Sequence, residues 1–269
     1  MDGNILFAFS LTLIAGLCTG IGSLLAFFTS RTNTKFLSFA LGFSAGVMIY
    51  VSMVEIFFKA QVTLTGVLGS PAGNWTTAAG FFGGMLLIAA IDSMIPEPGN
   101  PHEVKKVEDM RYRKNKTGGE TELLKMGTFT ALAIAIHNFP EGMATFIAAL
   151  QDPALGLAIA VAIAIHNIPE GVAISVPIYY ATGDKKKAFK LSFFSGLAEP
   201  LGALAAFLIL MPFLNEVMFG VMFAAVAGIM IFISLDELLP AAKKYDETHL
   251  PIYGLMLGMA VMAVSLILI

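Results

Sequence analysis

The chain has 269 residues, of which 57% are hydrophobic and 13% are charged, and its mean hydropathy is +0.80. A soluble domain is usually about 25% charged, so this chain lacks the polar surface that a soluble fold requires. We therefore expect an integral membrane protein. The net charge of −3 does not indicate nucleic-acid binding. The single cysteine, Cys18, excludes an internal disulfide framework and a multi-thiolate metal site.

Eight apolar segments follow one another along the chain, each long enough to cross a bilayer as a helix. We expect one all-α transmembrane domain comprising residues 1–269, with a single long polar loop at residues 96–122. No basic residue precedes the first segment, so we expect it to be retained rather than cleaved as a signal peptide. The predicted spans are 5–28, 36–58, 75–95, 123–150, 155–180, 188–211, 215–240 and 251–269.

Basic residues alternate between consecutive loops. Of the 16 lysines and arginines, Lys59 alone lies in a loop of the opposite set. Short basic loops stay in the cytoplasm, so both termini are predicted to be extracytoplasmic and loop 96–122 cytoplasmic. The cytoplasmic set is Arg31, Lys35, Lys105, Lys106, Arg111, Arg113, Lys114, Lys116, Lys125, Lys185, Lys186, Lys187, Lys190, Lys243 and Lys244.

The spans contain repeats. Residues 131–144 and 160–173 match at 11 of 14 positions, and because the fourth and fifth spans are consecutive, they cross in opposite directions. Weaker matches relate the first span to the sixth at an offset of 180 residues and the second to the seventh at 182. This pattern predicts a 3+2+3 arrangement with an inverted repeat, the plan of many secondary transporters.

Polar side chains occupy the middle of three predicted spans, where an ionised group costs about 2.5 to 3.5 kcal/mol. No lysine or arginine lies at this depth, so we expect a bound metal cation to compensate the carboxylates. These candidate ligands are His137, Asn138 and Glu141 in the fourth span, His166, Asn167 and Glu170 in the fifth, and Glu199 in the sixth.

The spacing of these residues favours metal binding. A histidine and a glutamate at positions i and i+4 share a helix face, as His137 and Glu141 do, and as His166 and Glu170 do. Imidazole, carboxylate and amide ligands without thiolate suit Zn²⁺, Fe²⁺, Mn²⁺ or Co²⁺, held as one ion or as a bridged pair. Following each motif, Gly142 and Gly171 would permit close helix packing.

Other acidic residues lie nearer the span ends. Glu55 and Glu237 occupy equivalent repeat positions on opposite sides of the predicted site, with Asp236 beside Glu237 and Asp92 at the inner end of the third span. They could be staging points for an ion or ordinary interfacial carboxylates. Met48 is a further candidate, either as core packing or as a soft axial ligand.

Two alternatives to a metal carrier use the same ligands. An intramembrane di-metal enzyme would activate a bound water, but the motif here is HNxPE rather than HExxH, so no glutamate adjoins a ligand histidine as a general base. A passive metal-selective channel is the other alternative. We favour transport of a metal ion over catalysis, with no resident cofactor.

The chain resembles the ZIP (zinc- and iron-regulated transporter-like) family, and it is most similar to the bacterial branch of that family. The resemblance rests on HNFPEG at 137–142, HNIPEG at 166–171, GLAEPLG at 196–202, SLDELLP at 234–240 and NPHE at 100–103. It implies eight spans with external termini and a two-metal site formed by the seven candidate ligands.

The resemblance also implies a homodimer in the cytoplasmic (inner) membrane that imports divalent metal ions, with Zn²⁺ first and Fe²⁺, Mn²⁺, Co²⁺ and Cd²⁺ as further substrates. An elevator-like displacement of the metal-carrying helices is the implied mechanism. One difference from many relatives is the loop after the third span, where this sequence has only His102. That difference weakens the case for a metal-receiving role of the loop.

Overall fold

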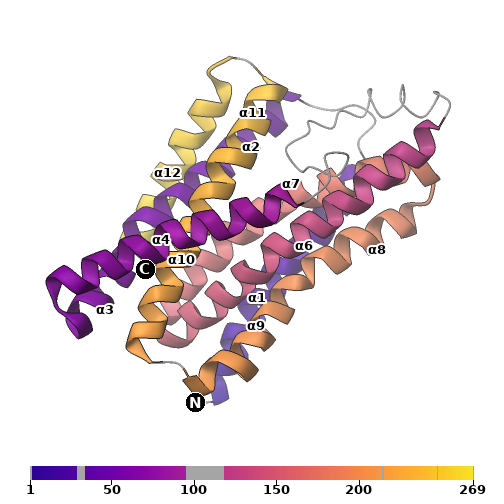
Figure 1. Cartoon of the computed structure of the whole chain (residues 1–269). Coiled ribbons are helices and arrows are strands. Elements are labelled where there is room, and N and C mark those ends of the chain that lie inside the picture. The colour runs from indigo at the N-terminus through magenta and orange to yellow at the C-terminus, as the bar shows by residue number, and fades with distance from the viewer. Residues whose placement is uncertain (1, 29–33, 95–117, 214, 247, 269) are drawn as a thin grey trace.

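The computed structural model describes residues 2–28, 34–94, 118–213, 215–246 and 248–268, and its regular elements are all helical (Figure 1). The predicted all-α class is confirmed for these residues. The main helices are α1 (Asp2–Ala26), α2 (Thr34–Val51), α3 (Phe57–Leu68), α4 (Ser70–Ser93), α6 (Gly119–Gln151), α7 (Pro153–Thr182), α8 (Lys185–Gly196), α9 (Ala198–Ala205), α10 (Glu216–Ile233), α11 (Leu239–Tyr245) and α12 (Leu250–Leu268).

Short segments with other helical geometry join several of these helices. The π-helix Ser52–Ile56 links α2 to α3, and the π-helix Ser234–Leu238 links α10 to α11. A third π-helix, Ala206–Leu210, and a 3₁₀ turn, Met211–Phe213, extend α9. Because α2 continues through its π-helix into α3, the second apolar segment is longer than the predicted 36–58.

The described residues of each predicted apolar segment are mainly helical. The helix α6 begins at Gly119, so the last residues of the predicted loop 96–122 are helical. Residues 96–117 of that loop, including His102, lie outside the described residues, as does Arg31.

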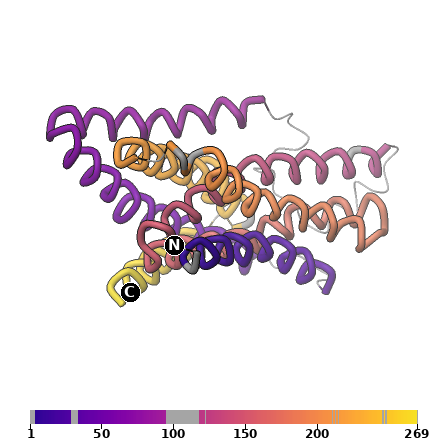
Figure 2. Tube along the Cα trace, turned by 90° about the horizontal axis from the view of Figure 1, so that it is seen from below, coloured from indigo at the N-terminus to yellow at the C-terminus, as the bar shows by residue number. Residues whose placement is uncertain are grey.

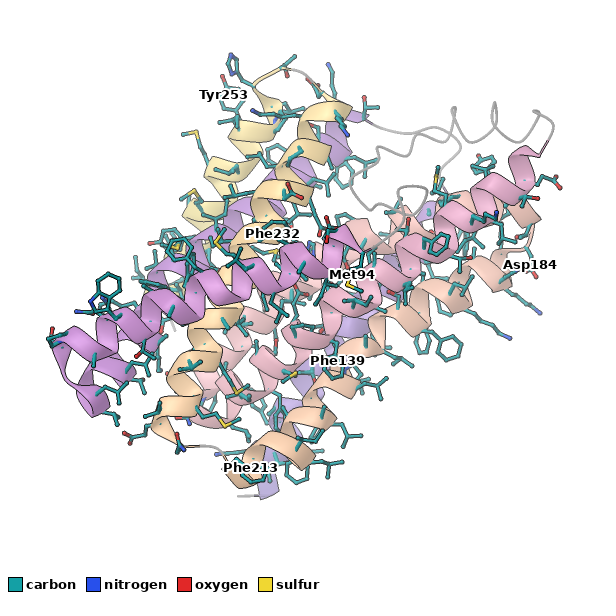
Figure 3. The ribbon with its side chains drawn as sticks, in the orientation of Figure 1. Met94, Phe139, Asp184, Phe213, Phe232 and Tyr253 are labelled. Carbon is teal, nitrogen blue, oxygen red and sulfur yellow. The ribbon has the colours of Figure 1, made fainter. Side chains whose placement is uncertain are left out.

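Within the described residues, seven helical stretches are long and apolar enough to cross a membrane. Helix α6, which has His137, Asn138 and Glu141 in its middle, is not among them. Large apolar side chains cover the outside of the bundle; Leu6, for example, is 70% exposed and Ile267 is 81% exposed. Figure 3 shows such side chains projecting from the ribbon along its length, from Phe213 at one end towards Asp184 at the other.

The helices pack as two groups. The "α2 group" comprises α2, α3, α4, α10, α11 and α12, and the "α7 group" comprises α1, α6, α7, α8 and α9. Contacts are dense within each group, whereas the "seam" between them is formed mainly by α2 and α12 against α7 and by α10 against α6. Figures 1 and 2 show α2 beside α12, and α6 beside α8 and α7.

Glycines allow close contact between helices of the same group. A Cβ atom on Gly46 of α2 would overlap the backbone of Leu255 in α12, and one on Gly171 of α7 would overlap the backbone of Thr19 in α1. Such helices touch backbone to backbone, which gives close and rigid packing. Within the described ranges, the interhelical glycine contacts all lie inside one group or the other, and none crosses the seam.

The two ends of the bundle differ in charge. The described residues of the predicted basic set, from Lys35 to Lys244, lie near helix ends at one side, which we call the lysine-rich end. The opposite, "terminal" end carries the start of α1, the end of α12, and the turns between α3 and α4 and between α6 and α7 (Figures 1 and 2). Lys59 lies on α3 towards this terminal end.

Candidate metal centre

All seven predicted ligands are buried in the α7 group. They come from the middle of α6, the middle of α7 and the start of α9, and none is more than 7% exposed. Burying carboxylates costs several kcal/mol each unless a counter-charge accompanies them. Among the described residues, no lysine or arginine side chain is buried. The cluster therefore has excess negative charge in its interior.

One predicted histidine–glutamate pair forms within α7. The Nε2 atom of His166 lies 2.8 Å from Oε1 of Glu170, one helical turn away. The helix continues through Pro169, which lies between the two residues. Since the Nδ1 atom of His166 and Oε2 of Glu170 have no hydrogen-bond partner among the described residues, both groups retain unused polar atoms.

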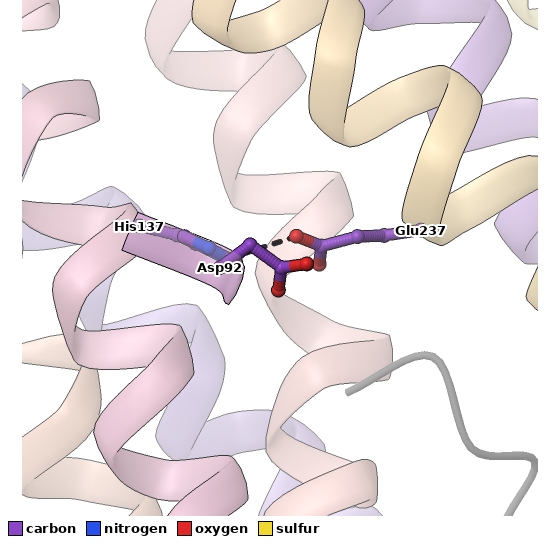
Figure 4. Close-up of side chains that lie close together, drawn as sticks. All are labelled: Asp92, His137 and Glu237. Carbon is purple, nitrogen blue, oxygen red and sulfur yellow. Dashed lines mark ion pairs between the residues drawn. The ribbon is translucent and has the colours of Figure 1, made fainter. Parts of the chain in front are cut away.

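The histidine of α6 is placed differently. The Nδ1 atom of His137 lies 3.2 Å from Oε1 of Glu237, which belongs to the π-helix after α10 in the α2 group. Asp92, near the end of α4, completes a trio whose potential ligand atoms lie within 4.8 Å of one another (Figure 4). This trio joins one residue of the α7 group to two of the α2 group, so it lies across the seam.

Asn167 orients Glu199. Its side-chain Nδ2 donates a hydrogen bond to the backbone carbonyl of Ala15 at 2.8 Å and another to Oε1 of Glu199. Both amide protons are thereby used, and the Oδ1 atom of Asn167 is buried without a hydrogen-bond partner among the described residues. The Oε2 atom of Glu199 is likewise buried without a hydrogen-bond partner among those residues. One oxygen from each residue is thus available to a cation.

Glu141 and Asn138 are the remaining predicted ligands. Glu141 is 1% exposed, and its two carboxylate oxygens have no hydrogen-bond partner in the described part of the chain. Asn138 is fully buried, and both polar atoms of its amide lack hydrogen-bond partners there. Buried polar groups normally have hydrogen-bond partners, so these unpartnered groups indicate a bound ligand, such as a cation, that their oxygen atoms would contact.

The close packing predicted for the motif glycines is confirmed. A Cβ atom on Gly142 would overlap the backbone of Glu199 itself, and Gly171 contacts α1 in the same way. Backbone contact at Gly142 fixes the distance between α6 and α9. The motif therefore supplies the polar groups and also the space that lets the helices bearing them meet.

The positions of Asp92 and Glu237 near span ends do not by themselves predict a place beside His137. A signal was nevertheless present: Glu55 and Glu237 occupy equivalent repeat positions, and the π-helices that carry them are related by the same 182-residue offset. A π-helix inserts one residue into a turn, which redirects the side chains around it, and such turns are frequent at functional sites.

A helical bundle with an apolar surface and buried imidazole, amide and carboxylate groups is typical of membrane proteins that bind or transport divalent metal ions. A family model described as ZIP Zinc transporter matches residues 101–266 of the chain. The chain is 71% identical over 269 residues to a protein named Zinc transporter ZupT from Lysinibacillus sphaericus, covering 100% of both. It is 69% identical to one of the same name from Oceanobacillus iheyensis, covering 99% of both. A third, from Clostridium perfringens, is 58% identical and covers 98% of this chain and 96% of its own.

The chain belongs to the ZIP zinc transporter family, as the sequence motifs predicted, and to its bacterial branch. It is a multi-pass cell-membrane protein that transports divalent metal ions. It is a transporter and not an enzyme, which excludes the di-metal enzyme considered from the sequence.

Proposed function

We propose that the chain imports Zn²⁺ into the cytoplasm by alternating access, with Fe²⁺, Mn²⁺, Co²⁺ and Cd²⁺ as further substrates. The observation that carries the proposal is a set of four buried glutamates near the seam between two helix groups: Glu141, Glu170, Glu199 and Glu237. Among the described residues, no lysine or arginine side chain is buried with them. Relatives named zinc transporters favour Zn²⁺ as the first substrate.

In the proposed site, imidazole nitrogens and carboxylate and amide oxygens replace the hydration shell of the ion. The ligands are His137, Asn138, Glu141, His166, Asn167, Glu170 and Glu199, and they hold one ion or a bridged pair in each protomer. The orphaned oxygens of Asn138, Glu141 and Glu199 support this assignment. The ligand set without thiolate binds weakly enough to release the ion.

Asp92 and Glu237 are proposed as the next station for the ion. They approach His137 from the α2 group, so the ion can exchange between ligands of the two groups without meeting a fully apolar environment. Both residues lie towards the lysine-rich ends of their helices. Glu55, in the matching π-helix nearer the terminal end, is the corresponding station on the other side of the site.

Motion of one group against the other is the proposed transport step. Glycine contacts join the helices of the α7 group to one another, and in the α2 group they join α2 to α12 and join α3 and α10 to α4. Among the described residues, no glycine contact crosses the seam. The sequence repeat relates spans within the same group: α1 to the α8–α9 segment, α6 to α7, and α2 to α10. An inverted repeat of this kind gives inward- and outward-facing forms of similar energy. This arrangement favours a carrier over a passive channel.

The remaining features of the proposal concern topology. Eight spans in a 3+2+3 inverted repeat would form one transporter domain over residues 1–269. The lysine-rich end faces the cytoplasm, because short basic loops are retained there, and both termini are external. Two copies form a homodimer in the cytoplasmic membrane, as the family resemblance implies.

Zinc uptake by purified protein in liposomes tests this function. Vesicles that enclose a fluorescent zinc indicator should fill faster than empty vesicles, with saturation at high Zn²⁺ concentration and a steep temperature dependence. His166→Ala and Glu170→Ala should each lower the initial rate about 10-fold or more. Uptake that neither substitution reduces would contradict the site, and a rate that never saturates would favour a channel.

A further inference from the structure

Polar side-chain contacts cross the seam near both of its ends. Towards the lysine-rich end, His137 contacts Glu237. At the terminal end, Nζ of Lys59 on α3 lies 2.9 Å from Oδ2 of Asp152, the residue between α6 and α7. The contact between Lys59 and Asp152 involves none of the predicted ligands, so it has no role in the metal site described above.

Asp152, which lies between α6 and α7, contacts both α7 and α3 through its carboxylate oxygens. Its Oδ1 atom accepts hydrogen bonds from the backbone N–H groups of Ala154 and Leu155, at 3.1 and 3.3 Å, and so caps the first turn of α7. Its Oδ2 atom accepts the hydrogen bond from Lys59. Because the cap fixes the carboxylate to the α6–α7 turn, Asp152 moves wherever the α7 group moves.

We propose that Lys59 and Asp152 form a latch that closes the terminal end of the seam and must open in every transport cycle. The inference rests on the alternating-access function proposed above. A displacement of about one helical turn, ~5.4 Å, would carry Oδ2 beyond hydrogen-bonding distance of the present position of Nζ. The outward-facing form therefore lacks this ion pair.

The ion pair between Lys59 and Asp152 is weak enough to break and re-form in each transport cycle. Lys59 is 33% exposed and Asp152 is 38% exposed, so water competes for both charges. Partly exposed ion pairs contribute little to stability, and losing this one should shift the ratio of the two forms by about two- to five-fold. A buried pair of the same geometry would hold the carrier in one state.

The identity of the cation supports a dedicated role. Lys59 is the one basic residue predicted outside the lysine-rich end of a chain with 16 lysines and arginines. A lone positive charge at the external face opposes the sorting that orients the protein, and a positive charge near the path repels incoming cations. Pairing with Asp152 neutralises the charge of Lys59 while this end is closed.

A reversible cross-link tests the latch directly. In a Cys18→Ser background, which removes the only native cysteine, Lys59→Cys and Asp152→Cys would be joined in liposomes by a bifunctional thiosulfonate about 10 Å long. We expect the cross-link to lower zinc uptake at least 10-fold and dithiothreitol to restore it. A second pair, Lys59→Cys with Gln151→Cys, leaves the α7 cap in place should loss of the cap impair folding.

The matched control is a cross-link within one helix group at the same end. Gln61 of α3 donates a hydrogen bond to Asn74 of α4 at 3.0 Å, and both belong to the α2 group. Joining Gln61→Cys to Asn74→Cys should leave uptake unchanged within two-fold.

Three results would overturn the latch. Undiminished uptake by protein cross-linked across the seam would show that this end need not open, and inhibition by the control cross-link would show that the reagent acts elsewhere. Absence of uptake by both seam pairs before cross-linking would show that Lys59 does more than latch. If the Cys18→Ser protein itself takes up no zinc, the proposed function fails and the latch fails with it; failure of the latch alone leaves uptake by that protein intact.

Discussion

His137 and Glu237 are 100 residues apart in the sequence, yet Nδ1 of one lies 3.2 Å from Oε1 of the other. The two side chains belong to different helix groups, and both are almost completely buried. The contact between His137 and Glu237 therefore exists only while the two helix groups keep their present relative position. This relationship makes Glu237 a sensitive place to test the transport path.

Replacing Glu237 with glutamine should lower the initial rate of zinc uptake about 10-fold or more, because it removes the carboxylate that contacts His137 while preserving side-chain volume. Asp236 is the matched control, since it is the neighbouring acid but its side chain is exposed. Asp236→Asn should stay within two-fold of the parent rate. Equal effects of the two substitutions would argue against a specific role for Glu237.

Replacing Asn167 with leucine should weaken zinc binding and lower the melting temperature in detergent. The change leaves the carbonyl of Ala15 and an oxygen of Glu199 buried without their donor, at a cost of about 1 to 3 kcal/mol for each unsatisfied group. Isothermal titration calorimetry and a thermal-unfolding assay would measure the two effects. Asn74→Leu, on the exposed side of α4, should change neither zinc binding nor the melting temperature. If Asn167→Leu also changed neither, Asn167 would not be part of the metal site.

The glycines of α4 offer a paired test of close helix packing. A Cβ atom on Gly84 would overlap the backbone of Ala225 in α10, whereas one on Gly83 would meet nothing within 4 Å. Gly84→Ala should therefore destabilise the protein by about 1 to 3 kcal/mol, and Gly83→Ala should be neutral or slightly stabilising. Thermal unfolding would give the melting temperatures of the two variants. Similar values for Gly84→Ala and Gly83→Ala would refute backbone contact between α4 and α10.

Asp152 should affect stability in two separable ways. Asp152→Ala removes the α7 cap and the ion pair, at a cost of about 1 kcal/mol for the cap, whereas Asp152→Asn retains a capping oxygen and removes only the charge. Melting temperatures should therefore rank the parent protein above Asp152→Asn and Asp152→Asn above Asp152→Ala. The reverse order of the two variants would show that the capping oxygen does not stabilise the protein.

The contribution of the Asp152 charge should also depend on pH. The hydrogen bond from Lys59 holds the pKa of the Asp152 carboxyl below its ordinary value of about 3.9. A lowered pKa means that the ion pair stabilises the fold fully above about pH 4 and is lost as the pH falls through the folded-state pKa. The difference in melting temperature between parent and Asp152→Asn should thus be constant from pH 5 to 7 and vanish in acid.

The local pattern of the sequence predicted most of the fold class and the positions of its helices. Apolar runs predict spans because a bilayer leaves a chain few ways to satisfy its backbone, and mid-span polar residues are rare enough to single out His137, Glu141, His166 and Glu170. Spacing of four residues predicted the contact between His166 and Glu170, since both lie on one helix face. These inferences depend on neighbours within a single helix.

Only the tertiary structure paired His137 with Glu237 and Asp92 rather than leaving it to its helical neighbour Glu141. It also divided the helices into two groups and placed Lys59 against Asp152. Such contacts depend on which helices adjoin, how close glycines let them come, and how a π-helix redirects a side chain. The periodicity of a single helix carries none of that information, because it specifies which face is buried and not which helix covers it.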